Sequence, residues 1–218
     1  MLQKQLREAM AILQRDVPTW DVPVVSLIAQ ESHDPYRVLI STLLSLRTLD
    51  QTTGPAAQRL FALADTPAAM VGLDRQTVER VIYPVGFYRN KAGQILEISQ
   101  RLLDDFDGRV PDDLDVLLTF NGVGRKTANL VLAEGYGIPA LCVDTHVHRI
   151  SNRWGYIKTK DPFDTEMTLR KKLPREYWLA YNPCLVALGQ HRCKPTSPMC
   201  SQCPVAHVCQ RVGVQRQR

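Results

Sequence analysis

Residues 117–128 read Leu-Leu-Thr-Phe-Asn-Gly-Val-Gly-Arg-Lys-Thr-Ala. Gly122 and Gly124, two positions apart, permit positive φ angles and a close approach of the backbone. Because helical patterns lie on both sides, we expect a tight turn followed at once by a helix. The N–H groups at the start of such a helix, with Arg125 and Lys126 beside them, form a site for an anion such as a DNA phosphate. The alternative is an ordinary tight corner between helices, which requires glycine only for its turn.

The rest of the chain is also predicted to be helical. Leu2, Leu6, Ala9, Met10 and Leu13 have the three-to-four-residue spacing of one helix face. Internal repeats and hairpin turns between alternating strand patterns are absent from the sequence, so we expect an all-α protein. Helices are expected over residues 2–13, 35–46, 55–63, 66–72, 74–82, 91–106, 111–120, 125–134, 144–153, 162–173 and 176–188.

Composition excludes several classes of protein. The 218 residues are 44% hydrophobic and 22% charged, which is ordinary for a globular protein and rules out disordered and collagen-like chains. No apolar run approaches the roughly 18 residues that a membrane helix needs. The first eight residues are polar and lack the apolar core of a signal peptide. We therefore expect a cytoplasmic protein that does not enter membranes, with cysteines that are reduced or bind metal.

The net charge of +5 comes from one end of the chain. No acidic residue follows Glu176, and the basic residues after it are Arg192, Lys194, Arg211, Arg216 and Arg218. This segment is either a solvated tail or a surface that attracts the phosphate backbone of a nucleic acid.

Four of the six cysteines form a cluster, C-x6-C-x2-C-x5-C, at Cys193, Cys200, Cys203 and Cys209. Four soft thiolates so close together in a reducing compartment indicate a metal centre. Their crowded, irregular spacing favours a [4Fe–4S] cluster, while structural zinc, which prefers two separated ligand pairs, is the alternative. Cys142 and Cys184 lie in apolar sequence and are expected to be packed thiols.

Lys126 and Asp144 are the candidate catalytic residues. Lys126 is expected in the first turn of a helix, where the positive end of the dipole favours the neutral amine that a nucleophile requires. Otherwise it is a solvated surface lysine. Asp144 precedes a helix and can cap it, or its carboxylate can stabilise positive charge on a sugar.

Together these motifs resemble the endonuclease III family of helix–hairpin–helix DNA glycosylases, over nearly the whole chain. The residues that carry the resemblance are Leu43-Leu44-Ser45 through Asp50, Val85 to Ala92, Gly122 to Ala128, Val143 to His146, and the four cysteines in the family's order. It implies a [4Fe–4S] cofactor on Cys193, Cys200, Cys203 and Cys209, in a loop that holds basic residues against DNA.

The resemblance also implies a mechanism. Family members flip a damaged base out of the duplex. Lys126 matches the nucleophilic lysine, which attacks C1′, displaces the base and forms a Schiff base before β-elimination cuts the strand. Asp144 matches the catalytic aspartate. A lysine at position 126 favours a bifunctional glycosylase and AP lyase over a monofunctional enzyme.

Two lobes are implied as well: residues 26–138 with the hairpin, and residues 1–25 with 139–218 around the cluster. Double-stranded DNA with damaged bases or abasic sites would lie between them, bound by a monomer associated with the nucleoid. The residues expected to contact DNA are Gly122, Val123, Gly124, Arg125, Arg47, Phe87, Lys91 and His146.

Three positions depart from the family's pattern. Arg47 stands where the family usually has Gln, Phe87 where relatives often have a Leu wedge, and Asn121 where Pro usually precedes the hairpin. Arginine is longer, charged and able to pair with guanine or to stack. Oxidised pyrimidines are the default substrate, and a mismatched or modified base is the rival. A non-catalytic DNA-binding module is the third hypothesis.

Overall fold

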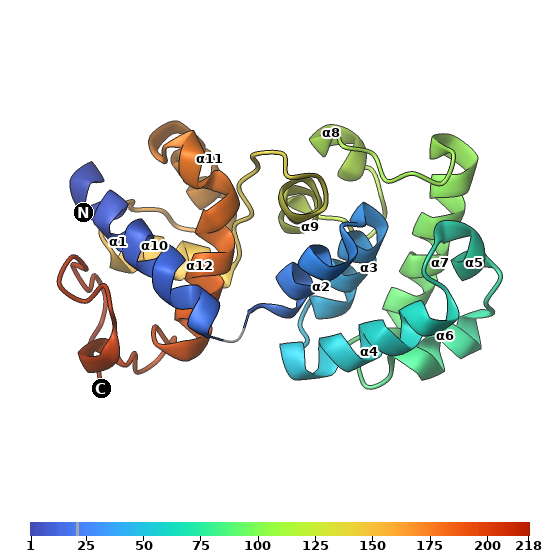
Figure 1. Cartoon of the computed structure of the whole chain (residues 1–218), viewed down its shortest axis with the longest axis horizontal. Helices are drawn as coiled ribbons and strands as arrows, with labels where there is room; N and C mark the ends of the chain where they lie inside the picture. Colours follow the sequence, from blue (N-terminus) through green and yellow to red (C-terminus); the bar gives the residue numbers. More distant parts are fainter. Residues whose placement is uncertain (21) are drawn as a thin grey trace. The chain divides into compact units, whose positions relative to one another are not determined.

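The computed structural model describes residues 1–20 and 22–218, and every regular element within them is a helix (Figure 1). This confirms the all-α prediction. None of the helices in these residues is long and apolar enough to cross a membrane. In chain order the elements are α1 (Gln3–Asp16), η1 (Val17–Thr19), α2 (Val24–Ser32), α3 (Pro35–Ser45), α4 (Asp50–Leu63), α5 (Pro67–Val71), α6 (Arg75–Ile82), α7 (Tyr88–Phe106), α8 (Leu114–Leu117), α9 (Arg125–Leu130), η2 (Val131–Gly135), α10 (Thr145–Arg153), α11 (Pro162–Lys172), η3 (Arg175–Tyr177), α12 (Trp178–His191) and η4 (Cys200–Gln202). The π-helix η2 continues α9, and the other η elements are 3-10 helices.

Side-chain caps explain why many helices begin where the sequence predicts. Asp34 accepts a hydrogen bond from the Tyr36 amide at 2.8 Å, and Asp74 accepts one from the Thr77 amide at 2.8 Å. Thr66 caps α5 in the same way. These oxygens satisfy amides that lack a partner within their own helix, so the capping residue fixes the start.

The predicted elements were wrong in three places. Helix α2 was not among the expected elements; it forms by packing against α3 and α4, although valines such as Val24 and Val25 favour strands. Helix α4 begins at Asp50 rather than at residue 55 and carries Pro55 inside it. Helix α8 is far shorter than the expected 111–120, because Asp113 caps its start through the amides of Asp115 and Val116 and the chain turns from residue 118 on.

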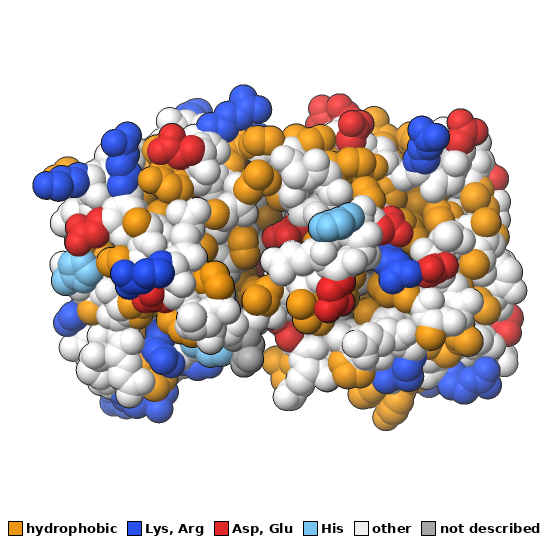
Figure 2. All heavy atoms as spheres, in the orientation of Figure 1, with side chains coloured by type: hydrophobic (Ala, Val, Ile, Leu, Met, Phe, Trp, Pro, Cys, Tyr) orange, Lys and Arg blue, Asp and Glu red, His pale blue; other side chains and the backbone are white. Residues whose placement is uncertain are grey.

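Contacts divide the chain into two compact units. We call Met1–Pro23 with Pro139–Arg218 the terminal unit, and Val24–Ile138 the central unit. On the face of the central unit drawn in Figure 2, basic and acidic side chains are interspersed. The excess positive charge of the chain lies in the terminal unit, after Glu176.

Each unit is built around one buried helix. In the terminal unit α12 is apolar around most of its circumference, and Tyr181, Leu185 and Leu188 are fully buried. In the central unit α3 is buried from Val38 to Leu44 and packs against α2, α4, α7, α9 and η2. Such a helix is hydrophobic all round because neighbours cover every side of it.

Candidate functional site

The hairpin between α8 and α9 has the form that its glycines predict. Gly122 adopts a φ of +82°, and a Cβ atom there would lie 2.6 Å from Nε2 of Gln94 in α7. A side chain at this position would therefore strain the backbone. The amide of the buried Val123 donates to the Phe120 carbonyl oxygen at 3.1 Å and closes the turn. A Cβ atom at Gly124 would meet no described atom within 4 Å, so the space beside the helix start is open.

Helix α7 holds this hairpin in place. The side-chain amide of Asn121 donates to Glu97 Oε2 at 2.9 Å. Arg101 donates to the carbonyl and hydroxyl oxygens of Thr119, both at 2.8 Å, and its guanidinium lies 4.3 Å from the centre of the Phe120 ring. Asn121, a departure from the expected Pro, thus fastens the hairpin by a hydrogen bond.

Lys126 is the second residue of α9, within the first turn. Its side chain and that of Arg125 are half-buried. The first hydrogen bond of the helix runs from the Ala128 amide to the Gly124 carbonyl oxygen at 2.9 Å. The side-chain amide of Asn129 donates to the Arg125 carbonyl oxygen, also at 2.9 Å. Lys126 therefore belongs to the first turn of α9, at the positive end of the helix dipole and two residues after Gly124.

Asp144 caps α10 in the terminal unit. Its Oδ1 atom accepts hydrogen bonds from the amides of His146 at 2.9 Å and Val147 at 2.8 Å. The side chain is half-buried. The cap uses only one carboxylate oxygen, so a structural role and a chemical role are compatible in one residue.

His146 is packed into a network that ends at the cysteine loop. A Cβ atom on Gly189 of α12 would lie 2.1 Å from His146 Nδ1, so the glycine makes room for the ring. The same nitrogen lies 3.1 Å from Nη2 of Arg149. Arg149 also donates to the Cys193 carbonyl oxygen at 2.9 Å.

The structure brings the four clustered cysteines together. Cys193, Cys200, Cys203 and Cys209 line one cavity in the terminal unit, with Trp154 on its wall. No group of three or more His, Cys, Asp or Glu side chains in the described ranges converges tightly enough for a single metal ion. The four thiols therefore surround the cavity without meeting at a single point.

The chemistry of these thiols fits a cationic metal centre. Burial raises the pKa of Cys203 to about 11 and also raises the pKa of Cys209, and neighbouring thiols add to both shifts. Four thiolates would therefore repel one another in this cavity unless positive charge lay among them. Cys142 and Cys184 lie elsewhere and are buried, and burial raises the pKa of Cys184 to about 12, as for a packed thiol.

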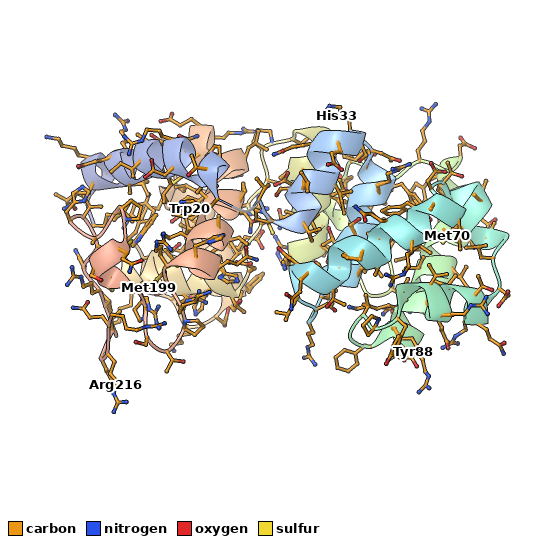
Figure 3. All side chains as sticks on the ribbon, turned by 60° about the horizontal axis from the view of Figure 1, so that its bottom comes forward. Trp20, His33, Met70, Tyr88, Met199 and Arg216 are labelled. Atoms are coloured by element: carbon orange, nitrogen blue, oxygen red, sulfur yellow. The ribbon has the colours of Figure 1, made fainter. Side chains whose placement is uncertain are left out.

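Arg153 and the C-terminal segment support the loop. Arg153 of α10 donates to Cys193 Sγ at 3.4 Å and to the Lys194 carbonyl oxygen at 2.7 Å. The Arg218 amide donates to the Pro198 carbonyl oxygen at 2.8 Å. The basic segment is therefore folded back onto the loop, and Figure 3 labels Met199 and Arg216 in these two parts.

Arg47 and Phe87, which come from different segments of the central unit, meet in the structure. Both are exposed, and the Arg47 guanidinium carbon lies 5.5 Å from the centre of the Phe87 ring. Both have left-handed backbones, with φ of +54° and +57°. An open hollow of about 360 Å³ beside them is also lined by Asn90 and Gln94.

Lys91 does not fit the expectation of a direct DNA contact. Its side chain is buried, and its ammonium donates to the carbonyl oxygens of Leu44 at 2.9 Å and Leu46 at 2.6 Å and to Thr48 Oγ1 at 3.2 Å. Burial lowers the pKa of this ammonium to about 8. An ammonium enclosed by three acceptors stabilises the protein interior instead of meeting a phosphate.

Sequence reasoning missed the residues that support the site. These are Thr48, Gln94, Arg101, Arg149, Arg153 and Gly189. Only Gly189 gave a signal, because a lone glycine inside an apolar helix indicates close approach of another group.

Comparisons with known proteins find relatives over most of the chain. Residues 40–175 match a family model described as HhH-GPD superfamily base excision DNA repair protein. An endonuclease III of Thermotoga maritima is 48% identical over 177 residues, which cover 81% of this chain and 83% of that protein. One of Bacillus subtilis is 36% identical and covers 85% and 84% of the two chains. A solved structure of a trapped endonuclease III–DNA covalent intermediate, an estranged-adenine complex, is similar over 97% of both chains, with a TM-score of 0.85 and 33% identity.

The cap at Asp144 makes a testable prediction about stability. Asp144→Ala should lower the free energy of unfolding by about 1 kcal/mol, because two amides of α10 lose their acceptor. Asp144→Asn should retain most of the stability, since asparagine caps as well as aspartate. Urea denaturation of both variants checks this. Equal stability of the alanine variant and the wild type would contradict the cap.

Proposed function

The chain belongs to the endonuclease III family of HhH-GPD base excision DNA repair proteins, and from this premise we propose that Lys126 is the nucleophile of a bifunctional DNA glycosylase and AP lyase. The observation that carries the proposal is the position of Lys126 in the first turn of α9, directly after the Gly122–Gly124 turn. We propose that the amides and open space of this turn receive a DNA phosphate, together with Arg125.

The proposed reaction starts with the damaged nucleotide flipped out of the duplex. The uncharged Nζ atom of Lys126 forms a bond to C1′ while the bond from C1′ to the base breaks, and the base leaves with that electron pair and takes up a proton. The Asp144 carboxylate stabilises the positive charge on the sugar and assists proton transfer. Because Asp144→Asn keeps the cap, this variant separates the loss of charge from the loss of the helix start.

Strand cleavage follows from the same covalent link. Opening of the sugar gives a Schiff base between Nζ and C1′. Removal of a proton from C2′ then breaks the bond from C3′ to oxygen, which cuts the strand 3′ to the abasic site. Water hydrolyses the Schiff base and restores the amine.

We further propose that Cys193, Cys200, Cys203 and Cys209 hold a [4Fe–4S] cluster. When bound, the cluster supplies positive charge among the thiolates and cross-links the loop at four points. Arg149 and Arg153 fasten this loop to α10. The proposed partner is double-stranded DNA with damaged bases or abasic sites, bound by a monomer at the nucleoid in the cytoplasm.

We propose that Arg47 affects which lesions the protein recognises. Oxidised pyrimidines are the proposed substrates. A mismatched or modified base is the second candidate, favoured by the Arg47 guanidinium stacked on Phe87. An arginine in this place can donate two hydrogen bonds to guanine, so the opposite base is expected to affect the rate.

Covalent trapping tests the nucleophile. Borohydride should fix the wild-type protein to DNA that contains an abasic site, and Lys126→Ala should abolish the adduct, because the proposed Schiff base forms on Nζ of Lys126. Arg125→Ala is the matched control: it removes the neighbouring cation, so at saturating protein the adduct should persist. Trapping of Lys126→Ala at the wild-type level would rule out the assignment.

Metal analysis tests the cluster. The purified protein should be brown and contain iron and labile sulfide in equal amounts. Cys203→Ser should lose most of both, whereas Cys184→Ala, which removes a thiol outside the cavity, should retain them. A colourless protein that contains zinc would overturn the iron assignment.

A panel of duplexes tests the lesion range. Each carries an oxidised pyrimidine, a mismatch or a modified base opposite each of the four bases. Arg47→Gln should reduce the preference for guanine opposite the lesion by about tenfold, the value of one good base contact. Arg89→Gln is the control, because Arg89 also stacks on a neighbouring ring, that of Tyr88. A similar change in both variants would show that Arg47 has no special role.

A further inference from the structure

The buried ammonium of Lys91 bonds to residues on both sides of Arg47. Its acceptors include the Leu46 carbonyl oxygen and the Thr48 hydroxyl, which precede and follow Arg47 in the chain. The backbone amide of the same lysine donates to the Phe87 carbonyl oxygen at 3.0 Å. One residue therefore contacts the loop that carries the guanidinium and the segment that carries the ring.

A second set of contacts joins the same two segments. The Gly86 amide donates to Thr48 Oγ1 at 3.1 Å, and a Cβ atom at Gly86 would lie 2.7 Å from the Arg47 carbonyl oxygen. The two segments therefore approach closely at Gly86, where a side chain would collide with the Arg47 carbonyl oxygen. Figure 3 labels Tyr88, the first residue of α7, next to this segment.

The backbone at both exposed residues requires outside support. Left-handed φ angles are unfavourable for Arg and Phe and persist only where the surroundings hold them. The ammonium of Lys91 bonds to the residues on either side of Arg47, and the Lys91 amide in the first turn of α7 bonds to the Phe87 carbonyl oxygen.

We infer that Lys91 is a positioning residue for lesion recognition: it fixes the loop at residues 46–48 against the start of α7, so that Arg47 and Phe87 are presented to DNA as a stacked pair. The inference rests on the proposed glycosylase function. The simpler role, a lysine that only satisfies carbonyl groups at the end of α3, would affect stability alone.

The test uses Lys91→Met, which keeps the length and apolar stem of the side chain and removes the ammonium. Base release from duplex DNA under single-turnover conditions should fall on the order of tenfold, as for loss of a charge-assisted hydrogen bond that acts only in recognition. Borohydride trapping on a single-stranded abasic oligonucleotide should stay within about twofold of wild type, because no opposite strand needs to be separated from the lesion.

A double-mutant cycle separates positioning from general structure. In a background of Arg47→Ala with Phe87→Ala, Lys91→Met should cause no further loss of base release. Equal losses on duplex and single-stranded substrates, or an undiminished loss in that background, would overturn the inference. Should Lys91→Met unfold, Thr48→Val, which removes the shared hydroxyl, carries the same comparison. A wild type that releases no base and is not trapped would overturn the proposed function as well, whereas an active wild type matched by Lys91→Met would overturn this inference alone.

Discussion

One face of α7 determines where the functional groups of the central unit lie. At its start the helix holds Phe87 and, through Lys91, the loop that carries Arg47. Further along, Gln94 packs against Gly122, and Glu97 and Arg101 bond to the hairpin before Lys126. Gln94 lies seven positions after Phe87, which is about 10 Å along the helix axis, or roughly three base steps of DNA. A rigid helix therefore sets the spacing between the residues expected to read the lesion and the hairpin of the nucleophile.

Local chemistry explains what could be predicted from the sequence. The turn at Gly122 requires a positive φ, which glycine adopts most easily. The helices that follow Asp34, Asp74 and Asp144 begin there because each aspartate accepts a hydrogen bond from an amide two or three residues further on. The four clustered cysteines could be predicted as one ligand set because they lie within one short loop. In each case the interacting groups are close in the chain, so residue type and spacing are enough.

Tertiary contacts decided what the sequence could not predict. Lys91 lies in a motif that resembles a DNA-binding segment, but its acceptors come from residues 44–48, far away in the chain. Its burial follows from the packing of α7 on α3. Helix α2 likewise forms because α3 and α4 cover it, although its valines favour strands. The meeting of Arg47 with Phe87 depends on the same packing.

In the terminal unit α10 positions the candidate functional groups, as α7 does in the central unit. Asp144 caps its start, His146 follows in the first turn, and Arg149 and Arg153 near its end bond to the cysteine loop. The helix is only nine residues long, so a shift of the cysteine loop at its end would also move the Asp144 carboxylate at its start. A metal centre bound by the four cysteines would fix the loop and, through α10, also Asp144, although no cysteine takes part in the proposed reaction. Catalytic groups held on packed helices keep their geometry better than groups on loops, which gives a physical reason for a structural cluster in such an enzyme.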